Sequence, residues 1–252
     1  MRRLKTEIDS HGPIAIFEDP EPGAAYVIGG DISLSRSADS DKCSACIAKR
    51  SPMHRRLEQV AEFWGMMSPY QFGELLALLG RRYNYALLNP ERNLVEAVKA
   101  GITAAGYPDN CLFIAENRMS VYGRLEPVYF TQTTAKNKKF LVDTGLDYLQ
   151  RGIWRTRSKP LLAEIGAVQK NEKNIPELGS MDRVMAWLMA VHADALTPAV
   201  QAVDLDKKPP RVVPMGVDPY FFKLHHGMLK DEDQAEAENV PDWEDERGTY
   251  GS

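Results

Sequence analysis

The 252-residue chain contains 44% apolar and 26% charged residues, a composition typical of a globular protein with one core and some extensions. No run approaches the roughly 18 apolar residues of a membrane span, and the first residues lead into no apolar signal sequence. The three cysteines cannot form an even set of disulfides, which favours a reducing compartment. These features predict an intracellular protein.

Charge is distributed unevenly along the chain. The net charge is −4, but residues 231–246 hold nine acidic residues and no Lys or Arg, so the remainder carries +5. The acidic segment is also poor in aromatic residues, which predicts a disordered tail.

The first predicted strand covers 25–31 and ends in an acid. Its apolar residues give way to Gly29, Gly30 and Asp31, so the aspartate is expected at the rim of a sheet instead of inside it. An acid in this place is most often a turn former.

A polar loop and two further strands are predicted next. The loop, 32–41, contains Asp39 and Asp41, and strands over 42–49 and 57–64 follow it. The first of these strands forms a hairpin with 25–31.

Cys43 and Cys46 have the spacing of a redox or zinc motif. They fall inside the predicted strand 42–49 and not at a helix N-terminus, and no second cysteine pair exists to complete four zinc ligands. We therefore expect both thiols to pack in the core.

A helix begins at Ser68, where serine, Pro69 and Gln71 form the pattern of a capping box, and it ends over 80–84. The strand 85–89 follows, and Pro90 ends it because proline has no N–H to donate. Glu91 then stands at a second strand end.

The next predicted helix covers 94–106, with Asn93 and Glu96 as its capping box and Gly106 as its stop. A strand over 111–115 completes this part. Alternating strands and helices indicate parallel strands, and the earlier hairpin makes the sheet mixed, so we expect an α/β fold with helices on both faces.

Residues 118–160 are rich in basic and aromatic side chains, a mixture found on surfaces that contact a phosphate backbone. A solvated basic face is the alternative. The cationic residues are Lys136, Lys138, Lys139, Arg151, Arg155, Arg157 and Lys159.

The last predicted helix opens near Met181 with Asp182 in its first turn, where the helix dipole favours a negative charge. Asp182 alone would be an ordinary helix-start residue. With Asp31 and Glu91, however, it makes three carboxylates on separate elements, and carboxylate oxygens are the ligands that Mg²⁺ and Mn²⁺ prefer.

Four stretches resemble the nuclease domain of bacteriophage terminase large subunits, which has a ribonuclease H-like fold. They lie in the family's order and span most of residues 12–195. One difference is that the family often has two adjacent aspartates at the last site, where Met181 precedes Asp182 here. The four stretches are 12–20 with 26–31, 91–108, 152–162 and 181–186.

The resemblance implies a lead-in over 1–24, a ribonuclease H-like domain over 25–200 and a C-terminal extension over 201–252. It implies a metal-dependent endonuclease that cuts double-stranded phage DNA concatemers during packaging, in the cytoplasm of the infected host. The implied partners are DNA, the terminase ATPase part, the small terminase subunit and the portal or procapsid. The chain has no G-x-x-x-x-G-K-[ST] motif, so we expect no ATP hydrolysis.

The expected chemistry uses two divalent ions, Mg²⁺ or Mn²⁺, to activate water and neutralise the phosphate. Asp31 would bridge both ions, while Glu91 and Asp182 would each complete one. Outer-shell contacts are expected from Asp39, Asp41 or Asn93. DNA contacts are expected from Lys136, Lys138, Lys139, Arg155, Arg157 and Lys159, with Arg155 or Lys159 holding a phosphate.

Two other functions are compatible with the sequence. A Holliday-junction resolvase or transposase core would use the same carboxylates but prefer branched DNA. A non-catalytic DNA-binding or packaging assembly module would use its acids only as turn formers.

Overall fold

A computed structural model describes residues 14–33, 42–51, 55–120, 124–170, 176–177 and 181–197, without the side chains of 135, 136, 169, 170, 176 and 177. Asp39, Asp41 and the acidic segment 231–246 lie outside the described residues. The predicted domain boundaries therefore stay predictions.

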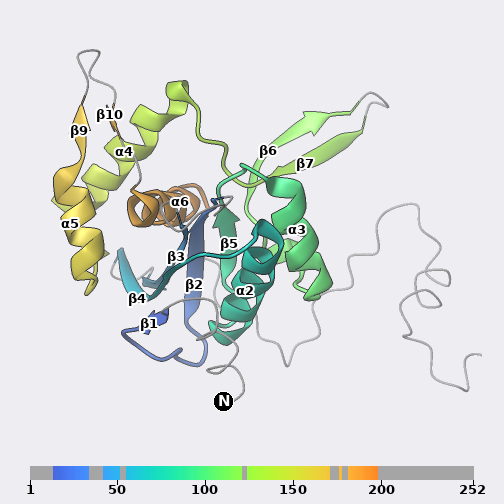
Figure 1. Ribbon diagram of the computed structural model, residues 1–252, viewed down its shortest axis with the longest axis horizontal. Coiled ribbons are helices and arrows are strands. Elements are labelled where there is room, and N and C mark those ends of the chain that lie inside the picture. The colour runs from blue at the N-terminus through green and yellow to red at the C-terminus, as the bar shows by residue number, and fades with distance from the viewer. Residues whose placement is uncertain are drawn as a thin grey trace, which may run out of the picture. The chain divides into compact units, whose positions relative to one another are not determined.

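The centre of the fold is a six-stranded mixed sheet (Figure 1). Its order is β1-β4-β3-β2-β5, and β8 pairs with β4 beyond the end of β1. The β2–β5 and β4–β8 pairs are parallel and the others antiparallel, which confirms the predicted mixed sheet. The strands are β1 (Ile14–Ile16), β2 (Ala25–Asp31), β3 (Cys43–Ser51), β4 (Arg56–Gly65), β5 (Leu87–Pro90) and β8 (Trp154–Arg155).

Both faces of the sheet are buried. Successive side chains of a strand point to opposite faces, so each strand contributes to the cores on both sides. In β3, Cys43 belongs to the hydrophobic core on one face and Cys46 to the core on the other. Both thiols are buried and neither forms a disulfide, which confirms that they pack in the core. Their three-residue spacing turns them away from each other, so they cannot act as a redox pair.

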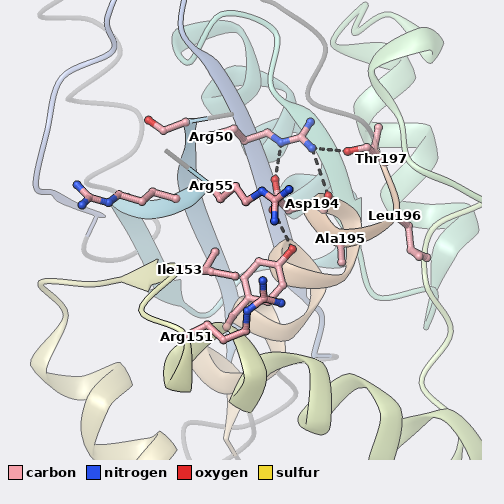
Figure 2. A pocket seen from close by; sticks show the side chains of 11 residues that line it. Arg50, Arg55, Arg151, Ile153, Asp194, Ala195, Leu196 and Thr197 are labelled. Carbon is pink, nitrogen blue, oxygen red and sulfur yellow. Dashed lines mark hydrogen bonds and ion pairs between the residues drawn. The ribbon is translucent and has the colours of Figure 1, made fainter. Parts of the chain in front are cut away.

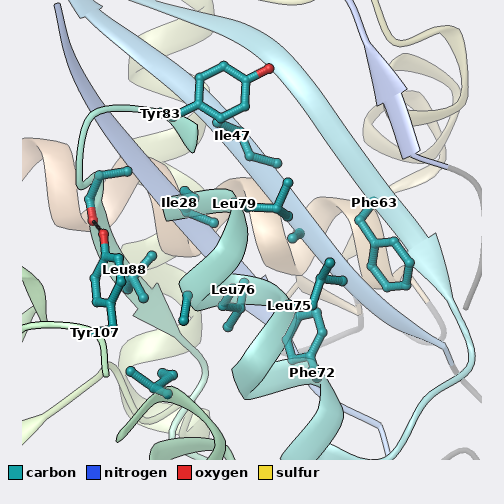
Figure 3. Packing of buried hydrophobic residues seen from close by; sticks show 14 of the residues in the cluster. Ile28, Ile47, Phe63, Phe72, Leu75, Leu76, Leu79, Tyr83, Leu88 and Tyr107 are labelled. Carbon is teal, nitrogen blue, oxygen red and sulfur yellow. Dashed lines mark hydrogen bonds between the residues drawn. The ribbon is translucent and has the colours of Figure 1, made fainter. Parts of the chain in front are cut away.

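Helices α2 (Pro69–Arg82) and α3 (Val95–Ala104) cover the first face (Figure 1). Figure 3 shows α2 laying Phe72, Leu76 and Leu79 against the sheet. The predicted capping box of Ser68 and Gln71 is confirmed, with both reciprocal bonds present. Glycines let α2 and α3 approach closely, since a Cβ on either Gly73 or Gly101 would lie 2.1 Å from a backbone oxygen of the other helix.

Three helices cover the second face, with α6 directly on the sheet and α4 and α5 packed against α6 (Figure 1). They are α4 (Ala135–Gln150), α5 (Lys159–Ala167) and α6 (Asp182–Leu196). Thr134 forms a capping box at the start of α4, and the Ser158 side chain caps the start of α5. A short ladder, β9 (Gln169–Lys170) with β10 (Pro176–Glu177), follows α5.

Two of three local predictions differ from the structure. The α3 cap is wrong, because Leu94 is the N-cap in a left-handed conformation, with no side-chain hydrogen bond. Strand β5 begins two residues later than predicted, since Asn84 and Tyr85 both have positive φ angles. Gly106 does stop α3, at φ +68°.

The predicted strand over 111–115 is only partly present. Leu112 makes an isolated parallel bridge to Leu88 beside β5, while Asp109–Cys111 forms a one-turn 3-10 helix. The chain then leaves the sheet as an unpredicted two-stranded ribbon of β6 (Ile114–Met119) and β7 (Leu125–Tyr129), which projects from the body (Figure 1).

Within the described ranges, no helix is both long enough and apolar enough to cross a membrane.

Candidate metal centre

Asp31 and Glu91 lie side by side at the ends of two neighbouring parallel strands. Gly30 of β2 is in register with Pro90 of β5, and the Glu91 N–H donates to the Gly30 carbonyl at 2.7 Å. The glycines let an apolar strand end in an acid at the rim, as the sequence predicted. Because Val27 belongs to the α6-side core and side chains alternate, Asp31 is directed to the α6 side of the sheet.

Asp182 reaches the same place because α6 lies unusually close to the sheet. A Cβ on Gly29 would be 2.0 Å from the Ala186 carbonyl oxygen and 2.3 Å from the Ala190 nitrogen. Only glycine therefore permits this contact between helix and strand. The close approach brings the first turn of α6, with Asp182, beside the end of β2.

The three carboxylates interact electrostatically. The pKa of Asp31 is raised well above its ordinary value, chiefly by burial, then by the charge of Glu91 and a hydrogen bond with it, and then by the charge of Asp182. The Ile32 N–H donates to Asp31 Oδ1 at 3.1 Å and opposes this shift. Glu91 and Asp182 are each only 6% exposed. The arrangement is a largely buried cluster of three acidic side chains.

Asp182 is held by two donors that the sequence analysis did not identify. The Lys42 backbone N–H and Trp64 Nε1 donate to Asp182 Oδ2 at 3.0 and 3.3 Å. The Trp64 ring also lies under two cationic groups, with Lys42 Nζ 3.6 Å and Arg183 Cζ 4.3 Å from its centroid. Strand pairing is the signal that could have identified Trp64, because Trp64 pairs with Ser44, which in turn pairs with Asp31.

Glu164 of α5 supplies the missing cap of α6. Met181, the N-cap residue, makes no side-chain cap bond. Instead, Glu164 Oε2 accepts hydrogen bonds from the backbone N–H groups of Arg183 and Val184 at 3.1 and 3.2 Å, and Oε1 pairs with Arg183 Nη1 at 3.0 Å. A carboxylate from another helix thus satisfies the first turn of α6 and fixes the segment that carries Asp182.

Asn89, two residues before Glu91, holds the end of β5 in place through hydrogen bonds. It is fully buried, and its Nδ2 donates to Met189 O at 2.8 Å and to Thr131 Oγ1 at 3.0 Å, while its Oδ1 accepts from the Thr131 N–H at 3.0 Å. These bonds join β5, α6 and the segment after β7. Sequence reasoning treated Asn89 only as a strand residue.

The donor set fits hard divalent cations in type, since all three groups are carboxylates that converge from separate elements. As they stand, no three Asp, Glu, His or Cys side chains in the described part of the chain are arranged to hold a metal ion. The reason is visible in the contacts: Asp31 is hydrogen-bonded to Glu91, and Asp182 Oδ2 is turned to Lys42 and Trp64. A cation held by the three carboxylates would have to replace these contacts.

The remaining predicted site residues are dispersed. Asn93 is exposed in the turn before α3, Arg155 is exposed in β8, and Lys159 is exposed at the first position of α5. Of the predicted DNA-contacting residues on α4, the side chain of Lys136 lies outside the description and Lys138 is half-buried.

Two of the predicted DNA-contacting residues already have acidic partners. Lys139 pairs with Asp143 one turn along α4. Arg157 lies 3.5 and 3.6 Å from Glu18 and Glu58 and also donates to the Phe17 carbonyl. Any DNA contact by either residue would compete with these pairs.

Comparison with known proteins gives a result only at the level of structure. No family model matches the sequence, and no curated protein matches it. Similar solved structures are nuclease domains of large terminases, so the chain has their ribonuclease H-like fold, as the sequence resemblance predicted.

Two of these structures illustrate the likeness. The large terminase nuclease of thermophilic phage G20c with bound magnesium has a TM-score of 0.53 at 14% identity, over 72% of this chain and 87% of that one. The nuclease domain of the Thermus phage P74-26 large terminase has a TM-score of 0.50 at 13% identity, over 72% and 84%.

Proposed function

We propose that this chain is a metal-dependent endonuclease that cleaves double-stranded DNA during viral genome packaging. The observation that carries the proposal is the convergence of Asp31, Glu91 and Asp182, with the pKa of Asp31 raised by burial and then by its two acidic neighbours. Turn-forming acids would face solvent separately and would have no reason to converge in a partly buried cluster.

In this proposal, Asp31, Glu91 and Asp182 hold divalent ions, with Asp31 shared because it lies between the other two in its interactions. When bound, Mg²⁺ or Mn²⁺ would supply an activated water and neutralise charge on the scissile phosphate. A cation binds the ionised form of Asp31, and the raised pKa of Asp31 disfavours that form. Metal binding and activity should therefore increase with pH through the titration of Asp31.

The surrounding side chains have supporting roles. Trp64 Nε1 and the Lys42 backbone N–H orient Asp182 through hydrogen bonds to Oδ2. The Lys42 ammonium and the Arg183 guanidinium stand over the Trp64 ring and put positive charge beside Asp182. Positive charge beside the cluster would favour the approach of a DNA phosphate.

The proposed place of the enzyme in packaging rests on its likeness to large terminase nucleases. The partners would be double-stranded DNA, a terminase ATPase part, a small terminase subunit and the portal or procapsid. The host cytoplasm would be the site of action.

Supercoiled plasmid is the first test substrate. The protein should nick or linearise it with Mn²⁺ or Mg²⁺, with little sequence preference, and EDTA should stop the reaction. A four-way junction and a linear duplex of the same length should be cut comparably. Strong preference for the junction would favour a resolvase, and inactivity with both metals on all substrates would favour an assembly module.

A further inference from the structure

A second candidate binding site lies at the other end of α6. It is a pocket of about 630 Å³ formed where β3 ends, β4 begins and α4 and α6 terminate (Figure 2). Among the described residues, four arginines and a single acid, Asp194, line it; the arginines are Arg50, Arg55, Arg56 and Arg151. With 15 residues in α6 and a rise of about 1.5 Å per residue, about 22 Å of helix separates it from the Asp182 end.

One arginine, Arg50, is committed to the fold. Its Nε pairs with Asp194 Oδ1 at 2.6 Å, and its Nη2 donates to the carbonyls of Asp194 and Thr197 (Figure 2). The Tyr148 hydroxyl donates to Asp194 Oδ2 at 3.0 Å. Arg50 therefore neutralises the only lining acid and also offsets the negative end of the α6 dipole.

The other three guanidinium groups lack comparable partners. Arg55 and Arg56 are exposed, and within the described residues neither has an ion pair or a side-chain hydrogen bond. Arg151 has only Asp147, 3.1 Å away on the same helix, in an exposed pair that water screens. Like charges gathered around one cavity repel each other, so the pocket favours an anion.

The shape and chemistry suit a phosphate group. Guanidinium forks match the oxygens of a phosphate with paired hydrogen bonds, and the cavity is in the range of small-ligand sites. The pocket also continues toward a proposed DNA contact, because Ile153 lines it and β8, with Arg155, follows directly and pairs with the start of β4.

We propose that this arginine pocket binds a backbone phosphate of duplex DNA at a second point, remote from the acidic cluster. The choice of DNA over a free phosphate rests on the proposed function. The pocket would hold the duplex without taking part in cleavage, as expected of a contact that positions DNA and reads no sequence.

The test is the salt dependence of DNA binding by the full chain in EDTA, where no cleavage occurs. For Arg55→Ala/Arg56→Ala, the log–log slope should fall by about 0.9 for each lost contact, or roughly 1.8 in total. At 0.1 M salt the affinity should drop on the order of 10- to 60-fold. Both residues are exposed, and an unchanged melting temperature would show that the variant is folded.

Arg55→Lys/Arg56→Lys is the matched control, because it keeps the charge but not the guanidinium fork. It should keep most of the slope and recover only part of the affinity. Full wild-type affinity in the lysine pair would mean that only net charge matters, and unchanged binding by the alanine pair would likewise overturn the proposal.

Pyrophosphate distinguishes the two sources of phosphate. It should compete with DNA for the wild type and much less for the alanine pair. If pyrophosphate binding is lost in the variant while the DNA slope is unchanged, the pocket takes a free anion and the DNA assignment is wrong. Cleavage with Mn²⁺ is measured separately, so an inactive wild type that still shows the slope change would refute the nuclease and leave the pocket's role intact.

Discussion

Gly29→Ala should disturb the candidate metal centre without touching a carboxylate. The added Cβ would lie 2.0 Å from the Ala186 carbonyl oxygen, whereas ordinary contact begins at 3.4 Å, so α6 and β2 must separate by about 1.4 Å. The obstacle is helix backbone, which cannot rotate away as a flexible side chain can. The whole first half of α6, including Asp182, would have to move.

Two consequences follow for Gly29→Ala. Overpacking of this kind costs about 1–3 kcal/mol, which for a domain of this size lowers the melting temperature by about 2–12 °C. Misplacement of a reacting group by about 1 Å costs roughly 100-fold in rate, so Mn²⁺-dependent cleavage should fall by about that factor at a temperature where the variant is still folded.

Gly166→Ala in α5 is the matched control. A Cβ there meets nothing within 4 Å, and alanine is the better helix former by about 0.5–1 kcal/mol. Its stability should be unchanged or slightly higher and its cleavage rate unchanged. If Gly29→Ala has the melting temperature and the cleavage rate of the wild type, the close approach of α6 to β2 does not determine the position of Asp182.

Three further variants test the surroundings of the acidic cluster. The folded state raises the pKa of Asp31, so the free energy of unfolding falls as pH rises from the unfolded pKa of about 3.9 through the raised pKa. Urea unfolding in EDTA at pH 5 and pH 8 should therefore show a smaller loss of unfolding free energy for Asp31→Asn than for the wild type. An equal loss in both proteins would contradict the raised pKa. Trp64→Phe removes the donor to Asp182 Oδ2, so half-maximal cleavage should need more Mn²⁺, whereas an unchanged Mn²⁺ titration would show that the bond is dispensable. Glu164→Ala removes the cap of α6 and should cost about 0.5–2 kcal/mol in thermal unfolding, while Glu164→Gln, which keeps an acceptor, should cost less; equal losses would assign the effect to charge alone.

The elements that carry Asp31, Glu91 and Asp182 could be predicted because each has a strong local signal. The apolar run before Gly29 and Gly30, the proline that ends β5 and the periodic α6 depend on neighbouring residues alone. The resemblance then supplied what local patterns lack, namely that these three elements meet. The mixed α/β fold followed from the same alternation of strands and helices.

The supporting groups could not be predicted, because their partners are remote in sequence. Glu164 caps a helix that begins 18 residues later, and Trp64 donates to an acid 118 positions away. The arginine pocket is a similar case, since Arg50 and Asp194 are 144 residues apart. The α3 cap was predicted wrongly for a different reason: Leu94 adopts a left-handed conformation that no side-chain pattern indicates.

The most direct test of the acidic cluster as the catalytic centre is Mn²⁺-dependent plasmid cleavage by the wild type and by Asp31→Asn, prepared and assayed together. Asp19→Asn is the control, because Asp19 is 76% exposed and pairs with Arg82 in a surface contact. We expect the wild type and Asp19→Asn to cut equally, Asp31→Asn to be folded but inactive, and EDTA to stop all cleavage. Cleavage by Asp31→Asn at the wild-type rate would contradict the assignment of the acidic cluster as the catalytic centre.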